Sequence, residues 1–247
     1  MKVLELFESA RALKGTLGED YFELRGLKLK PAHQDDIRFV PGLAYSGYAD
    51  EQADSLETLG HFHCVISAVR SVSGEIIGVH RTYLDGSEPI KLRPPGDKKR
   101  NKAKKIFGRY AGGMIRLGEI GECLGIGEGL ETTESFYALG LGPDDLTIAC
   151  GVSLGNLAGT ATGTIPHPTM KGRTIMNGVP DMARPGMILP PQVKRLILIG
   201  DGDSDPVETR MKLLTGARRF RAQGVDVSIC MAPDGEDFND VLRASLQ

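Results

Sequence analysis

Two apolar segments in the second half of the chain, each running into carboxylates, constrain its fold most strongly. The first ends at Gly127-Glu128-Gly129, and the second, residues 196–199, ends at Gly200-Asp201-Gly202-Asp203-Ser204-Asp205. Segments rich in Ile and Leu without alternation are typical of parallel strands covered on both faces. Ligands bind beyond the carboxyl ends of such strands. The sequence therefore predicts an α/β fold with an acidic site at one edge of a parallel sheet.

The whole second half alternates between strand and helix patterns, which favours a parallel sheet with right-handed crossovers. Residues 158–191 interrupt the alternation. They are rich in Gly, Pro and Thr and too long for a plain connector, so we interpret them as an insertion or a mobile functional loop. The expected strands are 122–127, 146–150, 194–200 and 225–231, and the expected helices are 130–140, 206–223 and 237–245.

The first half has a different, mixed pattern. Helical periodicity covers residues 2–13 and 19–24, and a loop containing Pro31, Pro41 and Gly42 follows. Residues 62–69 and 75–84 alternate as strands around a Ser-Val-Ser-Gly turn, which predicts an antiparallel hairpin. Because Gly112-Gly113 marks a break, we place a boundary near residue 118. We thus expect a smaller mixed α/β lobe over 1–118 and a catalytic domain over 119–247.

Charge is nearly balanced over the chain, with 30 Lys and Arg against 32 Asp and Glu, but it is unevenly placed. Between Lys91 and Arg109 there are nine Lys or Arg and a single acid, Asp97. A basic block beside an acidic site is typical of proteins that handle polyphosphates or nucleic acids. The alternative is a solvated basic surface.

The acidic residues define a candidate metal site. Glu128, Asp201, Asp203 and Asp205 are hard oxygen ligands on flexible turns, which suits Mg²⁺ or Mn²⁺. The alternative is turn chemistry, in which Asp205 before Pro206 caps a helix. The same choice applies to Asp234 and Asp237, which follow another strand. They are either accessory acids of the site or parts of a Pro-Asp-Gly turn with Asp237 as a helix cap.

Cysteine usage and hydropathy narrow the setting. The four cysteines form no Cys-x-x-Cys pair, which indicates reduced core thiols and argues against a zinc ribbon. No apolar run approaches the roughly 20 residues of a membrane span. We therefore expect a cytoplasmic protein without a membrane partner.

Taken in order, these motifs resemble a known family. Glu128 within Gly-Glu-Gly, followed by Asp201-Gly202-Asp203, looks like the Toprim domain shared by bacterial primases, topoisomerases and some nucleases. Three further segments resemble primases in particular, and residues 237–242 look most like the Toprim primases carried by plasmids and phages. These segments are residues 21–27, 76–81 and 233–237, and the resemblance as a whole covers roughly residues 19–243.

The resemblance implies a Rossmann-like Toprim domain that acts as a DNA-directed RNA polymerase. Such a primase joins nucleoside triphosphates into short primers on single-stranded DNA by two-metal-ion phosphoryl transfer with Mg²⁺ or Mn²⁺. The resemblance assigns catalysis and metal binding to Glu128, Asp201 and Asp203. With the basic block, it assigns nucleotide or nucleic-acid contacts to these cations: Arg81, Lys91, Lys98, Lys99, Arg100, Lys102 and Lys105.

Two departures from the family pattern bear on partners. The zinc-binding and helicase segments of such primases are not seen, so we expect a separate helicase or zinc-binding specificity protein to supply those roles. Residues 158–191 also lengthen the path from Glu128 to Asp201 beyond a minimal Toprim domain. Two alternatives stay open: a Toprim nuclease, and a non-catalytic nucleic-acid-binding accessory protein of a plasmid or phage replication or defence system.

Overall fold

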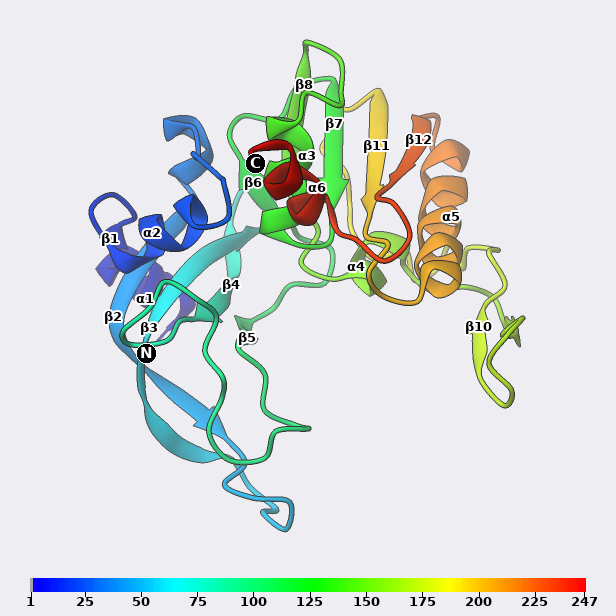
Figure 1. The fold of residues 1–247 in the computed structure, drawn as a ribbon. Coiled ribbons are helices and arrows are strands. Elements are labelled where there is room, and N and C mark those ends of the chain that lie inside the picture. Colours follow the sequence, from blue (N-terminus) through cyan, green and yellow to red (C-terminus); the bar gives the residue numbers. More distant parts are fainter. Residues whose placement is uncertain (1) are drawn as a thin grey trace.

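Two five-stranded sheets, one in each half of the chain, form the body of the protein (Figure 1). The computed structural model describes residues 2–247. The elements of the first half are α1 (Val3–Ser9), β1 (Arg11–Ala12), α2 (Leu17–Glu23), the 3₁₀ helix η1 (Pro31–Gln34), β2 (Ile37–Gly47), β3 (Glu57–Arg70), β4 (Ile76–Tyr83) and β5 (Lys104–Gly108).

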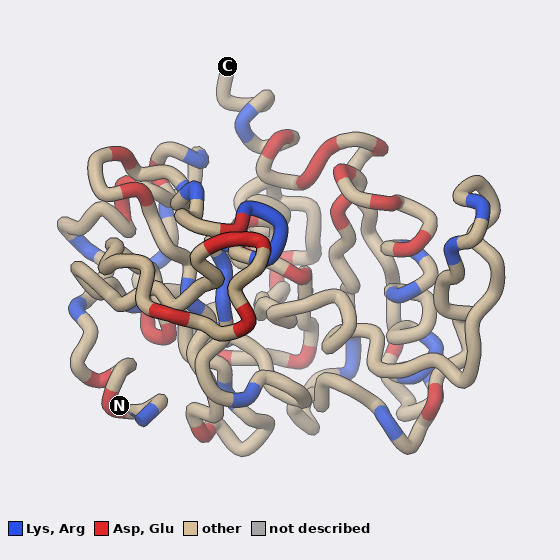
Figure 2. The backbone as a smooth tube through the Cα atoms, turned by 90° about the horizontal axis from the view of Figure 1, so that it is seen from below, with Lys and Arg blue, Asp and Glu red and all other residues tan. Residues whose placement is uncertain are grey.

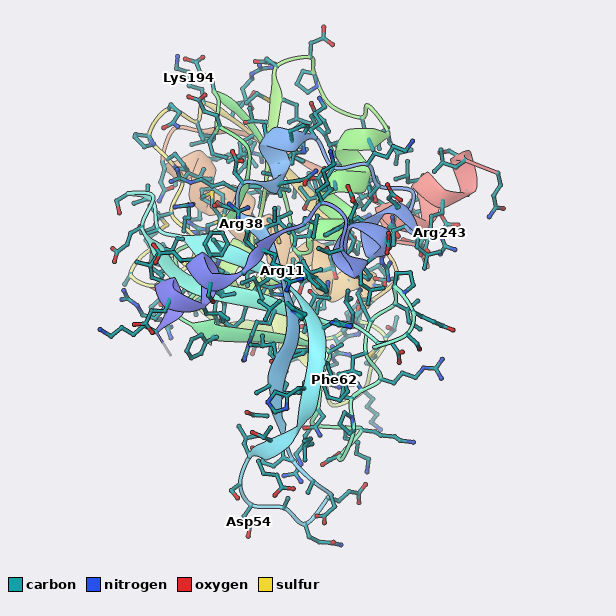
Figure 3. The ribbon with its side chains drawn as sticks, turned by 90° about the vertical axis from the view of Figure 1, so that its left-hand side faces the viewer. Arg11, Arg38, Asp54, Phe62, Lys194 and Arg243 are labelled. Atoms are coloured by element: carbon teal, nitrogen blue, oxygen red, sulfur yellow. The ribbon has the colours of Figure 1, made fainter. Side chains whose placement is uncertain are left out.

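The first sheet has the order β1-β2-β3-β4-β5 and is antiparallel throughout. The predicted hairpin is confirmed, since β3 pairs with β4 and Ser67 lies opposite His80. Strands β2 and β3 continue beyond the sheet as an arm, which Figure 3 shows projecting from the body with Asp54 at its far end.

Two predictions for the first half need correction. Strand β2 runs through Pro41 and Gly42, where we expected a loop, because a register shift between Val40 and Leu43 accommodates them. The expected helix 2–13 ends at Ser9, because residues 11–12 pair with β2 as strand β1 instead. The second helix, α2, is confirmed within two residues at its start.

The second sheet has the order β12-β11-β7-β8-β6. Its first four strands are parallel, as predicted, and β6 pairs antiparallel with β8 at the edge. Every strand and helix expected for this half is present within three residues of its predicted ends. The elements are β6 (Ile115–Leu117), β7 (Cys123–Gly127), α3 (Leu130–Ala138), β8 (Leu146–Cys150), α4 (Leu154–Ala158), β9 (Thr164–Pro166), β10 (Thr174–Met176), β11 (Arg195–Gly200), α5 (Pro206–Ala222), β12 (Asp226–Met231) and α6 (Phe238–Ser245).

Helices cover both faces of the second sheet, α3 and α6 on one side and α4 and α5 on the other (Figure 1). Phe136 of α3 and Phe238 of α6 meet edge to face, with ring centroids 5.2 Å apart. Their core cluster extends into the first half, where it includes Tyr21 and Leu84. One core cluster therefore spans both halves, and β6, which precedes the expected boundary at 118, is hydrogen-bonded into the second sheet.

The segment 158–191 contains a small two-stranded sheet, β9 paired with β10. This hairpin extends beside α5, away from the first lobe (Figure 1). The side chain of His167 anchors it, because it is almost fully buried and its Nε2 lies 2.9 Å from Oδ2 of Asp205. None of the helices in residues 2–247 is both long and apolar enough to cross a membrane.

Candidate active site

Acidic side chains gather at the carboxyl edge of the second sheet because its strands are parallel. Glu128 follows β7, Asp201 and Asp203 follow β11, and Asp237 caps α6 after β12. All four line one cavity of about 210 Å³. The structure thus brings together three predicted catalytic acids and one of the two predicted accessory acids.

The loop after β11 packs closely against the loop after β12, and this contact brings Asp237 near the other acids. Gly202 donates its N–H to the carbonyl oxygen of Glu236, and Gly235 donates to that of Gly202, at 2.9 and 2.8 Å. A Cβ atom on Gly202 would lie 2.1 Å from the carbonyl oxygen of Pro233. Only glycine permits this approach, so the Gly in Asp201-Gly202-Asp203 is needed for packing.

The first lobe contributes basic side chains to the same cavity. Lys91 and Lys104 both reach a single carboxylate, that of Glu131 on α3, at 3.2 and 2.8 Å. The hydroxyl of Tyr21 donates to the same carboxylate at 2.5 Å. Burial alone would raise the pKa of Glu131, but the two ammonium groups and Tyr21 outweigh burial and hold it well below its usual range.

Three further residues of the cavity lining depart from ordinary surface behaviour. Burial, together with Lys104, lowers the pKa of His80 to about 3, so its imidazole is neutral at physiological pH. Burial raises the pKa of the Cys150 thiol to about 12, and this thiol donates to the carbonyl oxygen of Glu128 at 2.9 Å. Val152 has a φ of +70°, a strained value for a β-branched residue of the kind that clusters at functional sites.

Asp201 is the most perturbed of the cavity acids. Burial raises its pKa from 3.8 to about 6, helped by Asp237, Asp203 and Glu128 and opposed by a hydrogen bond from Thr132. Thr132 donates to Oδ2 at 3.2 Å, whereas Oδ1 is buried without a hydrogen-bond partner. A buried oxygen without a partner is one that a bound cation would satisfy.

The donor set fits a hard divalent cation, because four carboxylates line one cavity and one of them has an unpaired oxygen. Within residues 2–247, no three His, Cys, Asp or Glu side chains are already grouped closely enough to hold a metal ion. A cation bound by Glu128, Asp201 and Asp203 would therefore have to draw their side chains together.

Two predicted acids lie outside this cavity. Asp205 accepts hydrogen bonds from the backbone N–H groups of Val207 and Glu208 as the N-cap of α5. Its other oxygen faces His167 and Arg173. Asp234 lies on an exposed turn, beside a shallow pocket next to the start of α5. We therefore leave Asp205 and Asp234 out of the metal site, and the helix-cap alternative is confirmed for Asp205.

Of the seven cations predicted to contact nucleotide or nucleic acid, only Lys91 lines the cavity. Arg81 follows His80 in β4, so it points to the opposite face of the sheet, where its guanidinium lies 5.6 Å from the Phe107 ring centre. Lys105 of β5 lies opposite Arg81 of β4 in the strand register, and its ammonium group lies 4.3 Å from the ring centre of Tyr45. These two cations face aromatic side chains on the far side from the acids.

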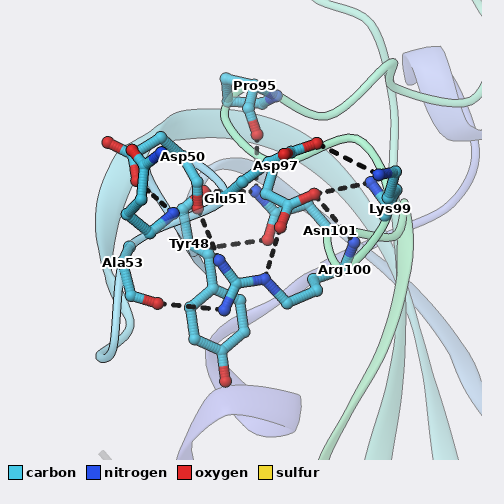
Figure 4. Close-up of polar contacts among 10 residues, drawn as sticks. Tyr48, Asp50, Glu51, Ala53, Pro95, Asp97, Lys99, Arg100 and Asn101 are labelled. Atoms are coloured by element: carbon cyan, nitrogen blue, oxygen red, sulfur yellow. Dashed lines mark hydrogen bonds and ion pairs between the residues drawn. The ribbon is translucent and has the colours of Figure 1, made fainter.

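Arg100 has a structural role that the sequence did not reveal (Figure 4). Its guanidinium pairs with Asp97, donates to the carbonyl oxygens of Asp50 and Ala53, and lies 3.9 Å from the Tyr48 ring centre. The prediction that Arg100 contacts nucleic acid is therefore not supported, because its donors clamp the basic block onto the arm.

The other cations of the basic block lie on the surface. Lys98 and Lys102 are exposed, and the ammonium of Lys99 lies 3.3 Å from Glu51. Figure 2 shows such blue and red segments interspersed along the chain. Lys98 and Lys102 remain predictions as DNA contacts.

Sequence reasoning missed five cavity residues, namely Arg25, His80, Lys104, Glu131 and Thr132. Strand alternation was the available signal for Lys104, because Lys104 and Lys105 face opposite sides of β5. The spacing after Glu128 could also have placed Glu131 near the cavity, on the first turn of α3.

Comparison with known proteins identifies the architecture. A sequence-family profile described as "Domain of unknown function (DUF7146)" matches residues 1–117, and a search of curated proteins finds no match. Solved structures are similar over nearly the whole chain. A DNA primase domain from Pseudomonas aeruginosa has a TM-score of 0.57 and 14% identity, with 98% of this chain and 73% of that chain covered.

Two further primase structures agree. The Escherichia coli primase catalytic core has a TM-score of 0.56 at 14% identity, covering 98% of this chain and 74% of that one. A DnaG primase catalytic domain bound to single-stranded DNA has a TM-score of 0.55 at 16% identity, covering 98% and 75%. This chain therefore has the fold of a DNA primase catalytic core.

Proposed function

We propose that this chain is a Toprim-type primase core that joins nucleoside triphosphates into short primers on single-stranded DNA. One observation carries the proposal: a single cavity is lined both by carboxylates at the carboxyl edge of the second sheet and by two lysines of the first lobe. A nucleotidyltransferase needs both, since it must hold metal beside the reacting phosphate and bind the rest of the triphosphate. The likeness to primase catalytic cores supports it at the level of the fold.

The reaction would join the 3′-hydroxyl of a primer to the α-phosphate of an incoming nucleotide, with pyrophosphate leaving. Mg²⁺ or Mn²⁺ held by Glu128, Asp201 and Asp203 would activate the attacking oxygen and neutralise the developing charge. Lys91 and Lys104 would bind the β- and γ-phosphates as point charges. His80, being neutral, adds a hydrogen-bonding group without adding charge.

The template would lie against the first lobe. Lys98 and Lys102 are exposed cations there, and one neighbouring structure, a DnaG catalytic domain, is bound to single-stranded DNA. On this proposal, the chain is a primase of the plasmid or phage type. A separate protein would supply the helicase or the zinc-binding module that selects template sites.

The direct test is to incubate the purified protein with single-stranded DNA, labelled nucleotides and Mg²⁺ or Mn²⁺, and to score synthesis and cleavage together. We expect metal-dependent synthesis. A charge-assisted phosphate contact is worth about 1.5–3 kcal/mol, so Lys91→Met should raise the nucleotide concentration needed at least tenfold. Lys194→Met is the control, because this exposed lysine precedes the amino end of β11, at the opposite edge of the sheet from the acids, and it should leave that concentration unchanged.

Other outcomes would select the alternatives. Cleavage of DNA without incorporation of nucleotides would identify a nuclease that uses the same acids. DNA binding with neither reaction would identify an accessory protein.

A further inference from the structure

Glu131 is the most deeply buried charged group of the cavity, and nothing in the proposed chemistry requires it. Its side chain is 7% exposed, whereas those of Lys91 and Lys104 are 37% and 35% exposed. Each lysine therefore contacts Glu131 while part of its side chain lines the cavity. An ammonium group has three N–H donors, so donors remain on both lysines.

The three groups come from separate parts of the chain. Lys91 lies in the long loop after β4, Lys104 begins β5, and Glu131 lies on the first turn of α3. Gly129 is the N-cap of that helix and directly follows Glu128. The carboxylate of Glu131 therefore ties both lysines of the first lobe to the helix that begins two residues after the cavity acid Glu128.

We propose that Glu131 is a positioning residue that holds Lys91 and Lys104 charged and aimed into the cavity, where both bind the triphosphate of an incoming nucleotide. This inference rests on the proposed function and assigns a role to a residue that would not itself touch the substrate. Tyr21 helps to hold Glu131 in place, because its side chain is buried, with 1% of the residue exposed, and its hydroxyl donates a hydrogen bond to the same carboxylate.

The charges around Lys91 support a positioning role for Glu131. Burial lowers the pKa of Lys91, and only Glu131 among its largest influences opposes that shift, since Lys104 and Arg25 also lower it. Without the carboxylate, two ammonium groups would face each other and Arg25 with no intervening negative charge. One lysine would then turn away or lose its proton, and the triphosphate would lose a contact.

The experiment compares nucleotide binding by the parent protein and Glu131→Gln, using a fluorescent ATP analogue with Mg²⁺ and no DNA. We expect at least tenfold weaker binding by the variant. In primer synthesis we expect the same increase in KM with kcat within about threefold of the parent, because the acids are unchanged. Glu131→Asp keeps the charge and should recover part of the lost affinity.

A matched control lies one turn further along the same helix. Glu134 is also buried and also paired, with its Oε1 3.0 Å from Nδ1 of His33, but it lies outside the cavity. Glu134→Gln should lower thermal stability while leaving nucleotide affinity unchanged. A general loosening of α3 would instead weaken binding in both variants and would overturn the inference.

The remaining outcomes are equally decisive. Unchanged or tighter nucleotide binding by Glu131→Gln would overturn the positioning role, while primer synthesis by the parent would leave the proposed function standing. If the parent protein binds no nucleotide, both the positioning role of Glu131 and the proposed function would be refuted. If Glu131→Gln does not fold, Tyr21→Phe removes only the supporting hydroxyl. It should weaken binding two- to fivefold, and unchanged affinity in that variant would count against the inference.

Discussion

Replacing Asp201 with Asn should stabilise the metal-free protein, although Asp201 lies at the centre of the proposed site. The structure raises the pKa of this carboxyl group from 3.8 to about 6, chiefly because it is buried. The folded protein therefore prefers the protonated form. The stability that this group contributes is fully present below about pH 4 and is lost as the pH rises through 6.

The size of the effect follows from the shift. One pKa unit corresponds to about 1.4 kcal/mol, so ionised Asp201 costs the folded state up to about 3 kcal/mol at pH 7. Asn cannot ionise, and its oxygen can still accept the hydrogen bond from Thr132. Its amide nitrogen would take the place of an oxygen without a partner, which offsets part of the gain. We expect Asp201→Asn to be more stable by about 1–3 kcal/mol at pH 7.

Urea denaturation of the parent and Asp201→Asn between pH 4 and 8, with and without Mg²⁺, measures this directly. Without Mg²⁺, the free energy of unfolding of the variant relative to the parent should increase from pH 4 to just above pH 6 and then level off. Added Mg²⁺ should stabilise the parent and close the gap, because the ion binds the folded state with this carboxylate as a ligand. A difference that is constant across this pH range would refute the reasoning about Asp201, as would equal stabilisation of both proteins by Mg²⁺.

Three other predictions concern the arm and the basic block, the β9–β10 hairpin, and the thiol of the cavity. Arg100→Ala should release the arm, which limited proteolysis would detect as faster cleavage near residues 48–54. The same variant should leave the salt dependence of single-stranded DNA binding unchanged. Lys98→Ala, in contrast, should reduce the slope of log binding constant against log salt concentration by about 0.7 if Lys98 contacts a phosphate. His167→Ala should destabilise the protein by about 1–3 kcal/mol and speed hydrogen exchange over residues 201–208, and unchanged exchange there would contradict the anchoring role. The thiol of Cys150, with its pKa raised to about 12, should resist alkylation at pH 8 until urea unfolds the protein, as mass spectrometry would show.

The sequence predicted the second half well because its signals are local. Apolar strands, helix caps and Gly turns recur in order, and parallel strands must bring Glu128, Asp201 and Asp203 to one edge of the sheet. Asp237 followed for the same reason, since it comes directly after the last parallel strand and caps α6.

The basic residues of the cavity could not be predicted as well because their geometry depends on contacts between distant residues. A one-residue difference in strand position decides that Lys104 faces the acids while Lys105 faces Tyr45. The clamp formed by Arg100 requires the arm, and the arm requires β2 to continue through Pro41, which read as a loop. The pairing of both lysines with Glu131 joins segments separated by up to 40 residues and leaves no local pattern.

The hydrophobic core shared by the two halves has a consequence for how the protein unfolds. Tyr21 and Leu84 pack in the same cluster as Phe136 and Phe238, so a cut near residue 118 would split a core and expose apolar surface on both fragments. We therefore expect one cooperative transition, with far-ultraviolet circular dichroism and tyrosine fluorescence changing at the same urea concentration. Neither half would then be a portable module, and the acidic and basic residues of the cavity would be gained and lost as a unit.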